Sequence, residues 1–148
     1  MSISLVIEDA RWRKLRGFQM RLKRAVGEAL RQAKAGDDAA LTILLTGDAK
    51  VKSLNCDFRG KDMATNVLSF PAASEDYLGD VAIAYGVTAR EAKASGKAIQ
   101  DHALHLAVHG VLHLMGFDHV TARQAKVMEP LEVRILKTLR IADPYEAA

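Results

Sequence analysis

Residues 109–119 read HGVLHLMGFDH, a stretch in which three histidines interrupt an otherwise apolar run. All five histidines of the chain fall between residues 102 and 119. On a helix, the first four of them lie within an arc of about 80°, and apolar residues occupy most of the remaining circumference. The pattern therefore predicts a buried helix with a single polar stripe, made of imidazoles: His102, His105, His109 and His113.

The spacing of these histidines predicts a metal site. His109 and His113 stand one helical turn apart, as do His105 and His109, so either pair could hold one cation. Gly116 allows the chain to turn just beyond the helix and to return His119 toward the first pair, which favours His109, His113 and His119 as the ligands. The alternative is that these are core histidines paired with buried carbonyl groups.

Three neutral imidazoles would leave a Zn²⁺ ion with two positive charges and one open position, the arrangement of a catalytic zinc site. Such an ion can activate a water molecule or polarise a phosphoryl oxygen. Nickel or copper would also suit imidazole ligands. Asp118 could orient a ligand or cap the turn, and the sequence does not separate these roles.

Length and composition predict one α/β or α+β domain over residues 1–148, with interleaved strands and helices. We expect strands at 2–7, 40–45, 66–70 and 78–85. We expect helices at 10–35, 48–57, 87–95, 98–115 and 121–140, with Gly17 and Gly27 as possible interruptions of the first and with Asp48 and Thr121 as N-caps. The single cysteine, Cys56, and the lack of a signal-like start predict a cytoplasmic protein, and no uncharged run reaches the ~20 residues of a membrane span.

Positive charge is concentrated near the start of the chain. Residues 11–34 contain nine Lys or Arg against one Glu, a net charge of +8, whereas the rest carries −5. A helix there would gather basic side chains on one face and could bind a polyanion such as RNA. The alternative is an ordinary solvated amphipathic helix. The candidate RNA-binding residues are Arg13, Arg16, Lys23, Arg24 and Arg31.

The spacing HxxxHxxGxxH resembles the metzincin zinc-protease motif HExxHxxGxxH. The residue after the first histidine is Gly110 here, where the proteases keep a glutamate as general base. Peptide hydrolysis by that mechanism would lose its proton carrier. A metalloprotease is therefore the least favoured function.

Three segments together resemble the YbeY family of bacterial endoribonucleases and ribosomal-RNA maturation factors: LNCDFRGKDMATNVLSFP (54–71), LGDVAIA (78–84) and HLAVHGVLHLMGFDH (105–119). The resemblance implies a zincin-like α+β single domain with a small mixed four-stranded sheet packed with helices. It implies a metal held by the three histidines, with Arg59 and His113 as catalytic residues. It also implies cleavage of single-stranded RNA, processing of ribosomal RNA including the small-subunit 3′ end, and ribosome quality control.

Two positions need separate comment. The family usually has aspartate where this chain has Asn66, so any ion pair made by that carboxylate is absent. Asp80 is retained, and we interpret it as mainly structural. The competing function is an RNA-binding ribosome-assembly factor whose metal only stabilises the fold.

Overall fold

Four strands form one mixed sheet in the computed structural model, which describes residues 1–74 and 76–146. They are β1 (Ser2–Ile7), β2 (Ala40–Thr46), β3 (Val67–Pro71) and β4 (Tyr77–Ala84). The order across the sheet is β1-β2-β4-β3, with β3 antiparallel to β4 and the other neighbours parallel. The expected α+β class and the small mixed sheet are confirmed, while the zincin-like designation stays a prediction.

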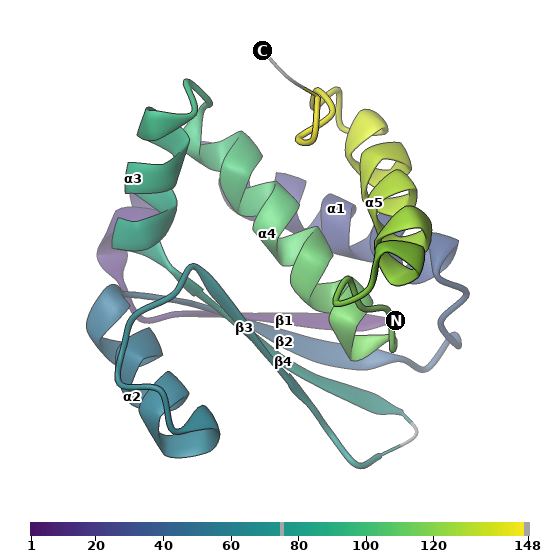
Figure 1. Cartoon of the computed structure of the whole chain (residues 1–148), viewed down its shortest axis with the longest axis horizontal. Helices are drawn as coiled ribbons and strands as arrows, with labels where there is room; N and C mark the ends of the chain where they lie inside the picture. The colour runs from purple at the N-terminus through teal and green to yellow at the C-terminus, as the bar shows by residue number, and fades with distance from the viewer. Residues whose placement is uncertain (75, 147–148) are drawn as a thin grey trace.

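Helices cover the two faces of the sheet unequally. α1 (Phe18–Gln32), α3 (Tyr85–Ala94), α4 (Ile99–Leu114) and α5 (Ala122–Lys137) lie over one face, and α2 (Asp48–Arg59) lies on the other (Figure 1). α4 runs through the middle of the larger layer and contacts α1, α3, α5, β3 and β4. None of the helices in the described residues is long and apolar enough to cross a membrane.

The histidine helix is buried as its pattern predicts. Nine residues of α4 are buried, including Leu104, Val108 and Leu112, which belong to the main core. A smaller core on the other face of the sheet, centred on Val51, Leu68 and Ala82, holds α2 against the strands. This second core is incomplete, since Leu44, Leu54 and Phe70 at its margin are only partly buried.

The helix expected at 10–35 is interrupted at Gly17, one of the two expected breaks, whereas Gly27 lies inside α1 without interrupting it. The chain forms a 3-10 turn at Ala10–Lys14 and begins α1 only after Gly17, whose φ of 72° is left-handed. Trp12 in the turn is fully buried, stacks on Phe18 and donates its indole N–H to the carbonyl of Thr46 at 2.9 Å. Burial of this large side chain outweighs continuation of the helix, and Gly17 adopts the backbone conformation that the break requires.

Of the two expected N-caps, Thr121 is confirmed and Asp48 is wrong. Thr121 caps α5 with a complete capping box, together with Gln124. The N-cap of α2 is Gly47 and not Asp48. The carboxylate of Asp48 instead accepts from the N–H of Val87 at 3.0 Å and pairs with Arg90, so it satisfies the start of α3 across the tertiary structure.

Gly79 is required where β4 pairs with the end of β3. Its φ is 136°, and a Cβ there would overlap the carbonyl oxygen of Phe70. We expect Gly79→Ala to lower the free energy of unfolding by about 2–4 kcal/mol, measured by urea denaturation. Gly36→Ala is the control, since a Cβ at Gly36 meets nothing within 4 Å. Equal stability of the two variants would contradict this account of the β3–β4 pairing.

Candidate metal centre and its cleft

The turn after α4 brings the third histidine back to the helix. Gly116 has a φ of 95° and follows the C-cap residue Met115. The N–H of Phe117 donates to the carbonyl of Leu112, and that of Gly116 to His113, each at 3.0 Å, which forms a Schellman motif. Asp118 then accepts from the N–H of His119 at 2.7 Å, and the same oxygen lies 3.9 Å from Nδ1 of the His119 ring, so the carboxylate caps the turn and also faces that ring.

Three imidazoles converge at this end of α4. The Nε2 atoms of His109 and His113 lie 3.0 Å apart, and one nitrogen from each of the three rings, including that of His119, lies within 4.8 Å of the others. His109 and His113 are half-buried, and His119 is exposed. The three rings are therefore close together and open to solvent on one side.

A buried carboxylate orients His109 by contacting Nδ1, the ring nitrogen that does not face His113. Oε2 of Glu132, a fully buried residue of α5, lies 3.3 Å from Nδ1 of His109 and 2.8 Å from Nε2 of His105. The hydroxyl of Tyr145 donates to the other carboxylate oxygen at 2.8 Å. Because Nδ1 of His109 is engaged by Glu132, its Nε2 faces His113 and His119 with a free lone pair.

The electrostatics of this cluster keep the carboxylate of Glu132 ionised and the imidazole of His113 neutral. Burial acts to raise the pKa of Glu132, but hydrogen bonds and charge from His105 and His109 outweigh it and lower the pKa to about 2. Burial, followed by the nearby charges of His109 and His119, lowers the pKa of His113. His113 is therefore neutral at neutral pH, the form that binds metals.

The donor set fits a transition-metal ion. Ligands about 2.0–2.1 Å from a tetrahedral Zn²⁺ ion would be about 3.3 Å from one another, close to the separation of the His109 and His113 nitrogens. A carboxylate behind one ligating imidazole is the usual outer-shell partner in zinc sites. His105, His109 and Glu132 form a second possible donor group. The contacts of both histidines with the carboxylate of Glu132 are sufficient to explain why these three side chains lie together.

Gly110 lies where α4 comes closest to the sheet. A Cβ there would be 2.7 Å from Val81 and 3.1 Å from the hydroxyl of Ser69, which donates to the carbonyl of Gly110 at 3.0 Å. A glutamate therefore cannot occupy this position without moving the helix off β3 and β4. Packing thus accounts for the absence of the protease base.

A cavity of about 630 Å³ opens beside the histidines and reaches the last residue of α2. Its lining includes Arg59, Ser69, His109, His113 and His119. Arg59 is exposed and precedes the helix-terminating Gly60, whose φ is 68°. The structure therefore brings the guanidinium of Arg59, which is distant in sequence, into the same cleft as the three imidazoles.

Asn66 fits its neighbours better than an aspartate would. Its amide nitrogen donates to Glu91 at 3.0 Å, and its oxygen accepts from the N–H of Val67. The same oxygen of Glu91 lies 3.0 Å from Nε2 of His102. An aspartate at this position would oppose the carboxylate of Glu91, so the amide removes a repulsion. His102 is thereby held by Glu91 at the wall of a cavity that also reaches His109 and His119.

The basic residues predicted to bind RNA lie elsewhere. All five candidates are exposed, Arg13 in the 3-10 turn, Arg16 before Gly17 and the other three on α1, but none of them lines the cavity at the histidines. Arg31 is paired with Glu28, and Arg21 of the same basic segment bonds to Asp101 and Gln100 of α4. The structure thus separates this basic surface from the cleft.

Glu132 was not predicted as a site residue, although its position carried a signal. It is an acidic residue on the face of α5 that also presents Met128, Leu131 and Ile135, all buried. A charge at a core position needs a partner, and imidazoles were the polar groups available on the facing helix.

Replacing Glu132 by glutamine should weaken metal binding by about 10- to 100-fold, because His109 loses the carboxylate that orients it. Competition with a chromophoric chelator measures this change. Glu28→Gln, on α1 and outside the cavities beside the histidines, is the control and should bind metal as the unchanged protein does. Identical affinities for the two variants would remove Glu132 from the metal centre.

Together the fold and the cluster define a single-sheet α+β protein with three histidines in an open cleft that could hold a metal ion. A family model described as Endoribonuclease YbeY matches residues 7–140, which is most of the chain. The chain therefore belongs to the YbeY family.

Several curated relatives carry the same name. The endoribonuclease YbeY of Maricaulis maris is 44% identical over 97% of this chain and 91% of its own length. That of Bordetella avium is 47% identical over 84% of this chain and 83% of its own. The solution structure of TM1509 from Thermotoga maritima shares the fold, with a TM-score of 0.65, 22% identity and coverage of 98% and 99% of the two chains.

Proposed function

We propose that this protein is a metal-dependent endoribonuclease that uses one Zn²⁺ ion held by His109, His113 and His119. The observation that carries the proposal is the convergence of these three imidazoles in one cavity with Arg59. Membership of the YbeY family, whose curated relatives are named endoribonucleases, supports RNA as the substrate. The exposed cleft is open to a flexible strand, which supports single-stranded RNA.

Each residue of the cleft has a separate task. When bound, the ion supplies a Lewis acid at the phosphoryl group. Arg59 would hold the same phosphate through its planar guanidinium and stabilise the charge that grows on it during cleavage. Glu132 fixes the ring of His109, and the half-buried His113 stays neutral. The attacking group is either water or the 2′-hydroxyl of the RNA.

The family's role leads to the biological proposal. The substrate would be ribosomal RNA, including the 3′ end of the small-subunit RNA, and the protein would act with ribosomes in the cytoplasm. Release of a precursor fragment from purified small-subunit RNA by the metal-loaded protein tests this assignment.

Elemental analysis of the purified protein, combined with a cleavage assay on single-stranded RNA with and without chelator, tests the reaction itself. We expect close to one zinc per chain, cleavage that the chelator abolishes, and recovery when zinc is returned. RNA that binds but stays intact under all conditions would contradict the enzyme and favour the assembly factor with a structural metal.

The five exposed basic residues Arg13, Arg16, Lys23, Arg24 and Arg31 are proposed to hold RNA outside the cleft. Contacts between these side chains and phosphates release counterions, so RNA affinity should fall steeply as salt rises. Anisotropy titrations at several salt concentrations measure the slope. Lys23→Ala combined with Arg24→Ala should reduce it by about two, and an unchanged slope would remove α1 from the RNA-binding surface.

A further inference from the structure

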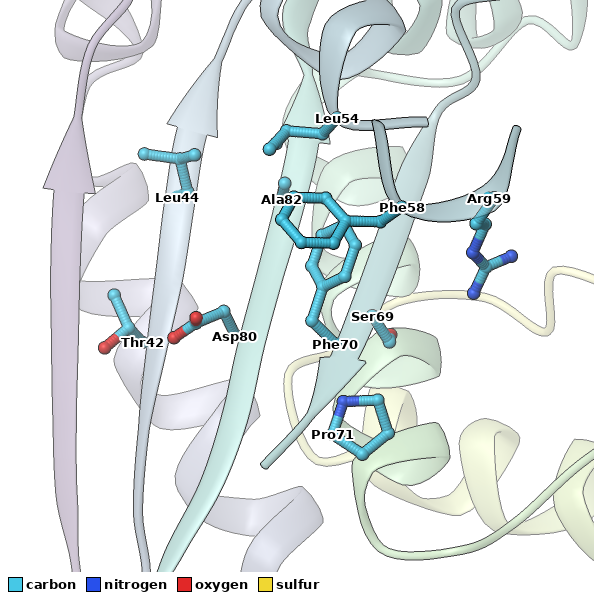
Figure 2. Close-up of a pocket in the computed structure, with 10 residues that line it drawn as sticks. All are labelled: Thr42, Leu44, Leu54, Phe58, Arg59, Ser69, Phe70, Pro71, Asp80 and Ala82. Carbon is cyan, nitrogen blue, oxygen red and sulfur yellow. The ribbon is translucent and has the colours of Figure 1, made fainter. Parts of the chain in front are cut away.

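A second cavity, of about 720 Å³, lies on the sheet face that α2 only partly covers (Figure 2). Its walls are the side chains of Leu44, Leu54, Phe58 and Phe70, and its lining also includes Thr42 and Asp80. It occupies the margin of the smaller core, where the strands β2, β4 and β3 extend beyond α2. The cavity is thus largely apolar and belongs to neither the main core nor the histidine cluster.

Packing within the fold does not explain why Phe58 is exposed. Its relative exposure is 70%, yet its ring meets that of Phe70 edge-on, with centroids 5.4 Å apart. Figure 2 shows the two rings overlapping in view on the α2 side of the cavity. A large aromatic side chain held at an opening, with one π-face in solvent, is suited to stacking a planar ligand.

The acidic group of the cavity, Asp80, lies beside Thr42, on the side opposite Arg59 and Ser69 (Figure 2). The hydroxyl of Tyr77 donates to Oδ1 of Asp80 and lies 2.7 Å from the hydroxyl of Thr42. Asp80 is exposed and faces the α2 side of the sheet, because its neighbour Val81 packs against α4. A carboxylate here repels a phosphate and accepts from an N–H donor.

The aromatic cavity and the cleft beside the histidines share part of their lining. Arg59, Ser69 and Pro71 line both of them, so the guanidinium of Arg59 stands between the three histidines and the aromatic cavity. A strand whose phosphate is held at Arg59 would have its neighbouring base within reach of Phe58, the residue before it in the sequence.

We propose that this second cavity is a nucleobase subsite, which takes the base beside the phosphate held by Arg59 and favours bases with an exocyclic amino group. The base stacks on Phe58, and its amino group donates to Asp80. The inference rests on the proposed function and adds a preference for adenine or cytosine over uracil. A protein segment is the other conceivable occupant, but the continuity with the cleft favours the base.

Binding and cleavage of short homopolymers test the subsite. Oligo(A), oligo(C) and oligo(U) of about twelve nucleotides fall within the size range of single-strand binding sites. Affinity is measured at low temperature on RNA shown to be intact, and kcat/KM is measured separately with the metal-loaded protein. We expect oligo(A) and oligo(C) to exceed oligo(U) by about tenfold in both measurements.

Replacing Phe58 by alanine should weaken binding of oligo(A) by roughly 5- to 150-fold, the range reported for loss of one stacked base. Phe58→Trp should retain the affinity, and Phe58→Leu, which keeps the apolar bulk but no π-face, should not. Val127→Ala, an exposed apolar residue of α5 outside both cavities, should bind as the unchanged protein does. Thermal denaturation checks that each variant is folded.

Replacing Asp80 by asparagine should abolish the preference, since the amide can also donate to the carbonyl oxygens of uracil. A preference that persists in Asp80→Asn, or equal RNA binding by Phe58→Ala and Phe58→Trp, would overturn the subsite and leave the cavity to a protein partner. If the unchanged protein binds RNA with the predicted preferences but never cleaves it, the proposed function fails and the subsite stands.

Discussion

Alanine at position 113 should abolish both zinc retention and RNA cleavage while leaving the protein folded. Only two imidazole donors would remain, too few for a stable catalytic zinc site. A bound metal contributes several kcal/mol of transition-state stabilisation, so cleavage should fall by at least about 10³-fold. The fold should survive, because the main core is formed by other side chains, including Trp12 and Leu112. Elemental analysis, an RNA cleavage assay and circular dichroism measure the three properties.

His102→Ala is the matched control for this experiment. His102 lies on the same helix and on the same imidazole face, but its ring is bound to Glu91. The control variant should retain zinc and cleave RNA. Unfolding of His113→Ala upon metal loss, with a folded control, would show that the ion stabilises the structure, as in an assembly factor.

Alanine at position 59 should separate catalysis from metal binding. Arg59 shares the cavity with the histidines but belongs to α2, and no hydrogen bond or ion pair joins it to them in the described residues. Loss of a group that stabilises developing charge typically costs about 10²–10³-fold in kcat. We therefore expect such a loss with full zinc content, measured on single-stranded RNA under saturating conditions.

Two further variants sharpen this prediction. Arg59→Lys keeps the charge but not the two-pronged geometry, and should recover only part of the activity. Lys61→Ala removes an exposed cation two residues away and should have little effect. Loss of zinc from Arg59→Ala would contradict a role of Arg59 in binding the substrate. It would indicate instead that Arg59 helps to maintain the metal site.

Local sequence patterns predicted much of this architecture. The four strands and the histidine helix were located within one or two residues, because alternation and helical periodicity report burial directly. The return of His119 was predictable from Gly116, since a glycine just after a helix favours the left-handed turn that the structure contains. The placement of these three histidines required no information from distant parts of the chain.

What the sequence did not reveal depends on contacts between distant segments. Gly17 indicated a possible break in the first helix, but not that residues 10–14 form a 3-10 turn in which Trp12 is buried against Phe18 and Thr46, a contact that helical periodicity does not report. Asp48 caps another helix for the same reason. The partnership of Glu132 with His109 joins residues on two helices, and the acidic residue on the buried face of α5 indicates that a partner is needed without saying which residue it is.

The residues of the candidate site come from both neighbouring and distant segments of the chain. Its three imidazoles come from one helix end and the turn that follows, whereas Arg59 arrives from fifty residues earlier in the sequence. We therefore expect affinity for the ion to depend on the end of α4, the turn after it and Glu132 behind His109, whereas turnover also requires the contribution of Arg59 from α2. If Arg59 acts as proposed, damage confined to the end of α2 should stop cleavage without releasing the ion, so metal content alone would overestimate the fraction of active molecules.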